Sequence, residues 1–200
     1  RKSITSCDII NADGKSVVWA SRFLGKPLPE RVAGPDLMQE VVKLASRKGY
    51  RIFLLGAREV VVAKVASIYA GLFSPDMISG YHNGYFGKDD EEEIVKQIAD
   101  SRSHILFVAM TSPKKELFLE KYAEQLRVPF VMGVGGAFDI VAGLTKRAPV
   151  WMQRSGLEWF YRLLQEPRRM WKRYLVTNSL FIYNVMKEKL SSHSDSQTGL

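Results

Sequence analysis

The chain has 200 residues, enough for one domain, or one domain with an appendage, around an apolar core. Hydrophobic residues make up 46% and charged residues 25%, which is ordinary globular usage and excludes an intrinsically disordered chain. The single cysteine, Cys7, excludes an intrachain disulfide framework and, with no secretory segment, indicates a reducing compartment. No apolar run approaches the ~20 residues of a membrane-spanning helix, so we expect a chain that lies on a bilayer at most.

Positive charge is concentrated in the last quarter of the chain. The net charge is +8, and residues 1–145 carry 19 basic and 17 acidic side chains, whereas residues 146–200 carry 10 and 4. The two parts therefore have net charges of +2 and +6. A basic C-terminal quarter predicts an anionic partner, and nucleic acid, anionic lipid and a pyrophosphate are the candidates.

Two motifs precede the first predicted strand. Asn11-Ala12-Asp13-Gly14 opens an apolar helical stretch, so Asp13 is either a helix N-cap or a carboxylate that takes a proton from a substrate hydroxyl. The proline-pinned loop at residues 27–36 is either a connector or a stiff support for Arg31, whose guanidinium could hold a phosphate or carboxylate. Spacing alone leaves both pairs of interpretations open.

Strands and helices alternate from residue 36 to residue 134. Three runs are apolar on both faces, which is typical of buried parallel strands: Arg51–Gly56, Ile105–Met110 and Phe130–Val134. Helical spacing predicts helices at residues 36–48, 58–72, 89–100 and 116–126. The pattern predicts an α/β fold with an open, mostly parallel, Rossmann-like sheet and helices on both faces.

Glycines and charged side chains follow these strands, where ligands of open α/β sheets bind. Gly56 follows the first strand, but without a G-x-G-x-x-G it is a weak indication of a dinucleotide site. Lys115 and the lysine before it open a helix after the second strand, which opposes the helix dipole unless an anion binds there. Two glycines and a carboxylate follow the third strand: Gly135, Gly136 and Asp139. The glycines would let a ligand approach the backbone and the carboxylate could bind a ribose or base, or else the segment is simply a tight turn.

Metal ligands are not visible in the sequence. There is no D-x-D motif, and the acidic run at residues 89–93 is explained by a helix start. His82 lies in a predicted turn, Gly80–Phe86, and has no second His or Cys at metal spacing, so we interpret it as a surface residue. We expect no metal and no cofactor.

No strand is predicted after Gly143. Pro149–Gln165 and Arg168–Lys189 are predicted helices, separated at Pro167, that mix arginines with three of the four tryptophans. A polar tail from Ser191 is predicted to be disordered. We therefore expect an α/β core at residues 1–144, a basic aromatic helical appendage at 145–190 and a disordered tail at 191–200.

Together these stretches resemble the WecG/TagA/CpsF family of glycosyltransferases. The resemblance runs from Asp8 to about Lys189 and rests on NADGKSVVWASRFLGKPLPERVAGPDLM, FLLGA, GYHNGYF, ILFVAMTSPKKELFLEKY and GVGGAFDIVAGLTKRAPVWMQRSGLEWFYRLLQEPRRMWKRYL. It implies a UDP-sugar-dependent hexosyltransferase that acts with inversion on a polyprenyl-pyrophosphate-linked saccharide, in the synthesis of bacterial cell-surface polysaccharide or teichoic acid.

The resemblance also implies roles for particular residues. Asp13 corresponds to the proposed catalytic base and Arg31 to the loop arginine near the sugar–phosphate. The appendage arginines of the family correspond to Arg162, Arg169 and Arg173. We thus predict substrate binding by Arg31, Gly56, Lys115, Gly135, Gly136, Asp139, Arg162, Arg169 and Arg173.

Two departures from the family pattern bear on these expectations. Lys115 stands where many members have glutamine, which leaves the donor sugar open between N-acetylmannosamine, its uronate and similar sugars. The family also has an upstream strand with a Thr-x-Asn motif that residues 1–10 do not match. Because the chain also begins at Arg1 in a polar stretch, we expect it to lack its first βα unit.

The expected partners are the UDP-sugar, the lipid-linked acceptor and an anionic membrane surface, with a homo-oligomer left open. The resemblance implies a cytoplasmic protein, peripheral on the inner face of the bacterial plasma membrane, with no nucleic-acid partner. One alternative is a nucleic-acid-binding module that uses the same basic, aromatic C-terminus. Another is a nicotinamide-dependent Rossmann enzyme, against which the missing G-x-G-x-x-G weighs.

Overall fold

The computed structural model describes residues 7–197, except for the side chains of residues 169, 173 and 192–197. Two compact units make up this part of the chain. The first comprises the segment up to Ile10 and Gly34–Lys146, and the second comprises Asn11–Ala33 and the segment from Arg147 onward. The structure thus groups Asn11–Ala33 with the C-terminal segment, whereas the sequence predicted one core over residues 1–144.

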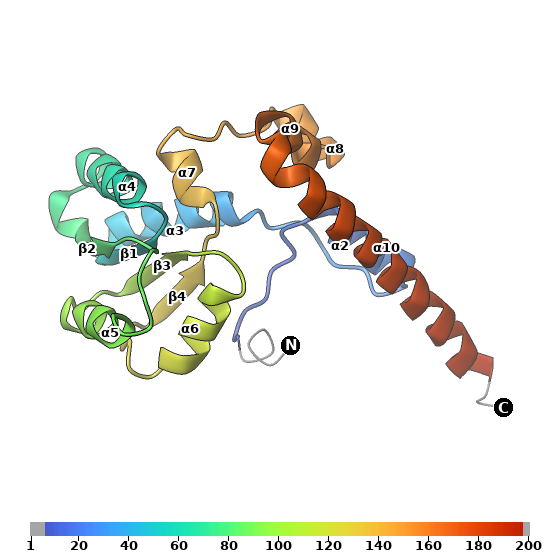
Figure 1. Cartoon of the computed structure of the whole chain (residues 1–200), viewed down its shortest axis with the longest axis horizontal. Coiled ribbons are helices and arrows are strands. Elements are labelled where there is room, and N and C mark those ends of the chain that lie inside the picture. Colours follow the sequence, from blue (N-terminus) through green and yellow to red (C-terminus); the bar gives the residue numbers. More distant parts are fainter. Residues whose placement is uncertain (1–6, 198–200) are drawn as a thin grey trace. The chain divides into compact units, whose positions relative to one another are not determined.

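The first unit is built on a four-stranded parallel sheet (Figure 1). Its strands are β1 (Ile52–Gly56), β2 (Ile78–His82), β3 (Ile105–Ala109) and β4 (Phe130–Gly133), in the order β2-β1-β3-β4. The two central strands, β1 and β3, are buried along their whole length because every residue in them is apolar or glycine. The predicted parallel α/β sheet is thus confirmed.

The strand β2 was not predicted, because Gly80–Phe86 was interpreted as a turn with exposed aromatics. The structure places Gly80 and His82 in the strand, paired with β1. Gly80 packs so closely on Phe53 that a Cβ there would lie 2.7 Å from the phenyl ring. The strand β2 contains Ser79 and His82 and is only partly buried, so its sequence lacks a continuous apolar run. The predicted run Phe130–Val134 does form a strand, β4, but at the other edge of the sheet, where it is mostly exposed and not buried.

Helices cover both faces of this sheet (Figure 1). One face carries α3 (Gly34–Lys48), α4 (Glu59–Leu72) and α7 (Ala137–Val141), and the other carries α5 (Glu91–Asp100) and α6 (Lys114–Tyr122). A 3₁₀ turn, η1 (Pro75–Met77), leads into β2. The first unit therefore has an apolar core on each side of its sheet, and each large buried side chain contributes about 1.5–3 kcal/mol to the free energy of unfolding.

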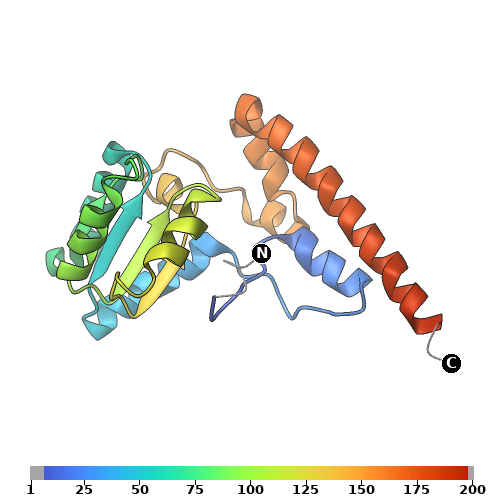
Figure 2. The same ribbon diagram turned by 60° about the horizontal axis from the view of Figure 1, so that its bottom comes forward.

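The second unit is helical (Figure 2). Its helices are α2 (Lys15–Phe23), α8 (Val150–Ser155), α9 (Glu158–Gln165) and α10 (Pro167–Gln197). Trp159 packs edge-on against Phe160 and Tyr174, with ring centroids 5.8 and 5.9 Å apart, which joins α9 to α10.

Two features of the second unit differ from prediction. The predicted helix Pro149–Gln165 is divided into α8 and α9, because Gly156 adopts a left-handed conformation between them. The helix α10 also continues to Gln197, where a disordered tail was predicted from Ser191. Within residues 7–197, no helix combines the length and the apolarity that crossing a membrane requires.

Candidate functional site

The carboxyl ends of β1 and β3 form the topological switch point of the sheet. From β1 the chain leaves through α4 on one face toward β2, and from β3 it leaves through α6 on the other face toward β4. In open α/β sheets, ligands bind in the crevice outside such a point. The predicted residues that follow the strands all lie at this edge of the first unit.

Gly56 ends β1 at this switch point. Its φ of +125° is available only to glycine, and an added Cβ would lie 2.5 Å from the carbonyl oxygen of Ala109. The N–H of Ala57 donates to that same oxygen at 2.9 Å, and the N–H of Gly84 donates to Ala57 O at 2.8 Å. Close backbone packing therefore requires glycine here, and contact of Gly56 with a substrate stays a prediction.

Lys115 lies along the end of β4. A Cβ at Gly133 would be 2.8 Å from Lys115 Cδ, and Lys115 Nζ is 3.1 Å from Glu116 Oε1. Partial burial acts to raise the pKa of Glu116, but hydrogen bonds from its own backbone N–H, from Lys115 and from Ser112 outweigh it, so this pKa lies below its usual value. Lys115 at the start of α6 opposes the helix dipole, and the sequence alone suggested that a bound anion compensates for it. In the structure, the carboxylate of Glu116 balances this positive charge.

The preceding lysine, Lys114, has a different position. Its Nζ donates to the carbonyl oxygens of Gly84 and Phe86, at 3.1 and 3.0 Å, and lies 3.9 Å from the centroid of the Phe86 ring. Lys114 therefore fastens the loop between β2 and α5 to the start of α6. Sequence reasoning missed this role, since Lys114 and Phe86 are far apart in the chain.

The residues after β4 complete this edge. Gly135 has a φ of +53°, and Gly136 occupies the N-cap of α7. Asp139 is half-buried in the first turn of α7, and its backbone carbonyl accepts hydrogen bonds from the N–H groups of Leu144 and Thr145. The structure therefore brings Gly56, Lys115, Gly135, Gly136 and Asp139 to one edge of the sheet.

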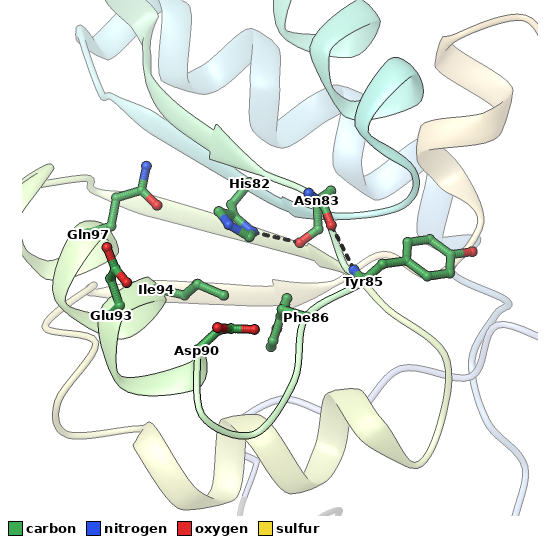
Figure 3. A pocket seen from close by; sticks show the side chains of 8 residues that line it. All are labelled: His82, Asn83, Tyr85, Phe86, Asp90, Glu93, Ile94 and Gln97. Atoms are coloured by element: carbon green, nitrogen blue, oxygen red, sulfur yellow. Dashed lines mark hydrogen bonds between the residues drawn. The ribbon is translucent and has the colours of Figure 1, made fainter.

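A polar pocket of about 350 Å³ lies beside the end of β2 (Figure 3). His82, Phe86 and Gln97 line it together with two carboxylates, whereas the ring of Tyr85 points away from the other side chains. His82 Nδ1 is 2.8 Å from the carbonyl oxygen of Asn83. Sequence analysis placed His82 on the surface, and its half-buried position in a pocket wall follows from the unpredicted strand β2.

No metal centre is found in the part of the chain that the structure describes, since no three His, Cys, Asp or Glu side chains there are placed to hold an ion.

Asp13 and Arg31 lie side by side in the second unit. The N–H of Val32 donates to Ala12 O at 3.0 Å, which aligns the two segments. Arg31 Nε donates to the backbone carbonyl of Asp13, and Arg31 Nη2 is 3.5 Å from Asp13 Oδ1. The capping position of α2 is occupied by Gly14, and the side chain of Asp13 is 64% exposed.

Two further charged residues join this pair from the C-terminal segment. Glu158 Oε2 accepts a hydrogen bond from Arg31 Nη2 at 2.6 Å, and Arg147 Nε is 3.9 Å from Glu158 Oε1. We call Asp13, Arg31, Arg147 and Glu158 the charged cluster. Sequence reasoning missed Arg147 and Glu158, and their only signal was an acidic side chain within a basic stretch.

The turn before α9 explains where Glu158 lies. Gly156, with φ +78°, ends α8, and the N–H of Leu157 donates to Met152 O at 2.8 Å. A Cβ at Gly156 would be 3.0 Å from Trp19 Cη2, so α2 packs directly on this turn. Glu158 then starts α9, where the helix dipole favours a carboxylate.

The predicted appendage arginines lie on the last two helices. Arg162 is four residues after Glu158 and so on the same side of α9. It is half-buried, and its Nε has no hydrogen-bond partner among the described residues. Arg169 and Arg173 lie on α10, and their side chains are outside the described part of the structure.

Comparison with known proteins identifies close relatives. A model described as the glycosyl transferase WecG/TagA/CpsF family matches residues 1–195. A Bacillus spizizenii protein is 37% identical over 196 residues, 98% of this chain and 75% of its own. Proteins of Bacillus subtilis and Staphylococcus aureus are 38% and 36% identical over 93% of this chain, and over 71% and 72% of their own. All three are named N-acetylglucosaminyldiphosphoundecaprenol N-acetyl-beta-D-mannosaminyltransferase.

Proposed function

Since this chain belongs to the WecG/TagA/CpsF family of glycosyl transferases, we propose that it transfers an N-acetylmannosamine-type sugar from a UDP-sugar to a polyprenyl-diphosphate-linked N-acetylglucosamine. The names of the relatives support the acceptor and the class of sugar. The observation that carries the reaction type is an exposed carboxylate, Asp13, beside the guanidinium of Arg31.

In the proposed reaction, Asp13 takes the proton from the acceptor hydroxyl as its oxygen attacks the anomeric carbon of the donor. The new C–O bond forms on the face opposite UDP, the bond to UDP breaks, and the configuration inverts. A positioned base of this kind contributes about 10²–10⁴-fold to the rate. The exposure of the carboxylate supports this role, because the acceptor hydroxyl must reach it.

The leaving diphosphate needs positive charge and hydrogen-bond donors. Arg31, in the second unit, carries a guanidinium suited to this role, and we propose Lys115, in the first unit, as a further substrate-binding residue. We propose Gly135, Gly136 and Asp139 for binding the nucleotide part of the donor. The names of the relatives favour N-acetylmannosamine as the donor sugar, and its uronate or a similar sugar are the alternatives that we propose to test.

We propose that the second unit binds an anionic membrane surface, so that the protein is peripheral. Large apolar side chains are exposed on its helices, among them Trp151, Trp171 and Tyr183. Basic residues accompany them, and each contributes about 1 kcal/mol to binding near an anionic surface. Aromatic rings with basic neighbours are typical of helices that lie at the membrane interface.

The test of this function is a transfer assay. The purified chain is mixed with a synthetic polyprenyl-diphosphate N-acetylglucosamine acceptor and each of a panel of UDP-sugars. We expect transfer of an N-acetylmannosamine-type sugar. The proposal is overturned if none of the UDP-sugars gives a product.

The role of Asp13 is tested in the same assay. Asp13→Asn removes the base and keeps its shape, so kcat should fall about 10²–10⁴-fold while UDP affinity stays nearly unchanged. The matched control is Glu30→Gln, an exposed carboxylate in the loop that carries Arg31, which should transfer at the wild-type rate. More than about a tenth of wild-type kcat in Asp13→Asn would contradict a general-base role.

A further inference from the structure

We infer that Glu158 is a positioning residue, which holds Arg31 so that Asp13 remains open to the acceptor. This inference rests on the proposed function, because it assigns Glu158 a role in the same transfer reaction. Glu158 does not act on the substrate in this scheme. It acts through Arg31.

The contacts of Arg31 show which carboxylate fixes its orientation. Arg31 Nη2 is 2.6 Å from Glu158 Oε2 but 3.5 Å from Asp13 Oδ1. Its Nε is used by the backbone carbonyl of Asp13, not by the side chain. Because charge-assisted hydrogen bonds are short and strong, Glu158 is the dominant anionic partner of this guanidinium.

The exposure of the two carboxylates also indicates that Glu158, and not Asp13, is the main partner of Arg31. The side chains of Arg31 and Glu158 are 16% and 28% exposed, whereas that of Asp13 is 64% exposed. An ion pair that is partly withdrawn from water is less screened than one at the surface. Glu158 therefore holds Arg31 from the protected side, and the accessible side of the charged cluster presents the Asp13 carboxylate.

The position of Glu158 is itself built into the fold. Gly156 and Leu157 form the turn that starts α9, and Trp19 of α2 packs on this turn. Arg147, at 3.9 Å, adds a second guanidinium on the other oxygen of Glu158. Removing the Glu158 carboxylate would leave Arg31 without its closest anion and let it swing onto Asp13, covering the base.

The experiment is a double-mutant cycle on transfer by the full chain, with Arg31→Ala, Glu158→Ala and the double variant. Misplacement of a catalytic group by about 1 Å can cost up to ~10²-fold, so kcat of Glu158→Ala should fall by about that much, with the donor KM changed less than about threefold. In the Arg31→Ala background, Glu158→Ala should have no further effect, because the group it positions is gone. Losses in kcat that simply multiply would overturn the inference.

Conservative variants separate positioning from folding. Glu158→Gln keeps the shape and an acceptor oxygen, and Glu158→Asp keeps the charge, so both should recover part of the lost kcat at an unchanged melting temperature. If Glu158→Gln and Glu158→Ala both transfer at the rate of the control Glu30→Gln, Glu158 has no positioning role. If wild type is folded but transfers no sugar, the proposed function has failed instead.

Discussion

Gly156 is a residue on which the geometry of the charged cluster depends. Its left-handed backbone ends α8, and its missing side chain leaves room for Trp19 at the turn before Glu158. The sequence shows only that a glycine stands inside a predicted helix, which is weak information by itself. The structure adds that both its φ and its close contact require glycine.

Replacing this glycine should destabilise the second unit. In Gly156→Ala the left-handed conformation costs about 1–2 kcal/mol of unfolding free energy, and the new Cβ, 3.0 Å from Trp19 Cη2, adds to that loss. Urea denaturation measures both contributions. The control is Gly25→Ala, because Gly25 has a similar φ of +75° in the same unit and nothing within 4 Å of its Cβ position. Equal losses in the two variants would show that the Trp19 contact carries no cost.

Single side chains also show where reasoning from sequence stops. Asp13 and Arg31 could be chosen as candidates because a carboxylate and a loop arginine stand in suggestive motifs. Glu158 could not, because its contact with Arg31 joins residues 127 positions apart. Lys115 was correctly marked as unusual at a helix start, but its pairing with Glu116 depends on side-chain geometry that no spacing rule supplies.

At the scale of elements, α5 and α6 are joined by a polar contact at the surface of their shared face. Glu91 Oε2 accepts hydrogen bonds from Lys121 Nζ and Tyr122 Oη, both at 3.0 Å. Partial burial acts to raise the pKa of Glu91, but these hydrogen bonds and the positive charges of Lys121 and Lys114 outweigh it. The pKa of Glu91 in the folded protein therefore lies below its usual value.

This contact predicts an acid-sensitive contribution to stability. Because the pKa of Glu91 is lower in the folded than in the unfolded chain, its stabilising effect is present above the unfolded value of about 4.3. It is lost as the pH falls through the folded value. Glu91→Gln should thus show a smaller drop in unfolding free energy between about pH 5 and pH 3, measured by urea denaturation at each pH. The control is Glu92→Gln, at the exposed neighbouring residue, which should lose as much unfolding free energy as wild type. A drop in Glu91→Gln as large as in wild type would contradict this account.

The elements of the sheet were predictable to different degrees. The runs that became β1 and β3 are apolar throughout because both faces of a central parallel strand are covered by helices. The segment ISGYH gives no such signal, since a serine, a glycine and a histidine interrupt its apolar residues. The helices α3 and α4 were placed to within about two residues, because amphipathic spacing and flanking glycine mark them clearly.

At the scale of the molecule, the second unit is discontinuous in sequence, and this changes what a truncation should do. Ending the chain at Lys146 removes Arg147, Glu158 and α8–α10 but leaves Asn11–Ala33, which then lacks its packing partners. The first unit keeps its sheet and both apolar clusters.

We therefore expect the truncated chain to fold in its first unit and bind UDP, but to transfer no sugar and to lose binding to anionic vesicles. Trypsin should cut it rapidly within Asn11–Ala33, after Lys15, Arg22 or Arg31, whereas this segment of the full chain resists. A chain that ends at Leu190 keeps the charged cluster and is the matched control. Protection of Asn11–Ala33 in the shorter chain would show that this segment does not need the C-terminal helices.

The long separation between Arg31 and Glu158 has a consequence for biosynthesis. A ribosome makes the N-terminal part of a chain first, and domains fold as they emerge. Arg31 is therefore exposed as nascent chain while the whole sheet of the first unit is still being translated, and its partner is added 127 residues later. A polypeptide released before that point holds a folded sheet and an unassembled charged cluster. The charged cluster can therefore assemble only after Glu158 has been translated.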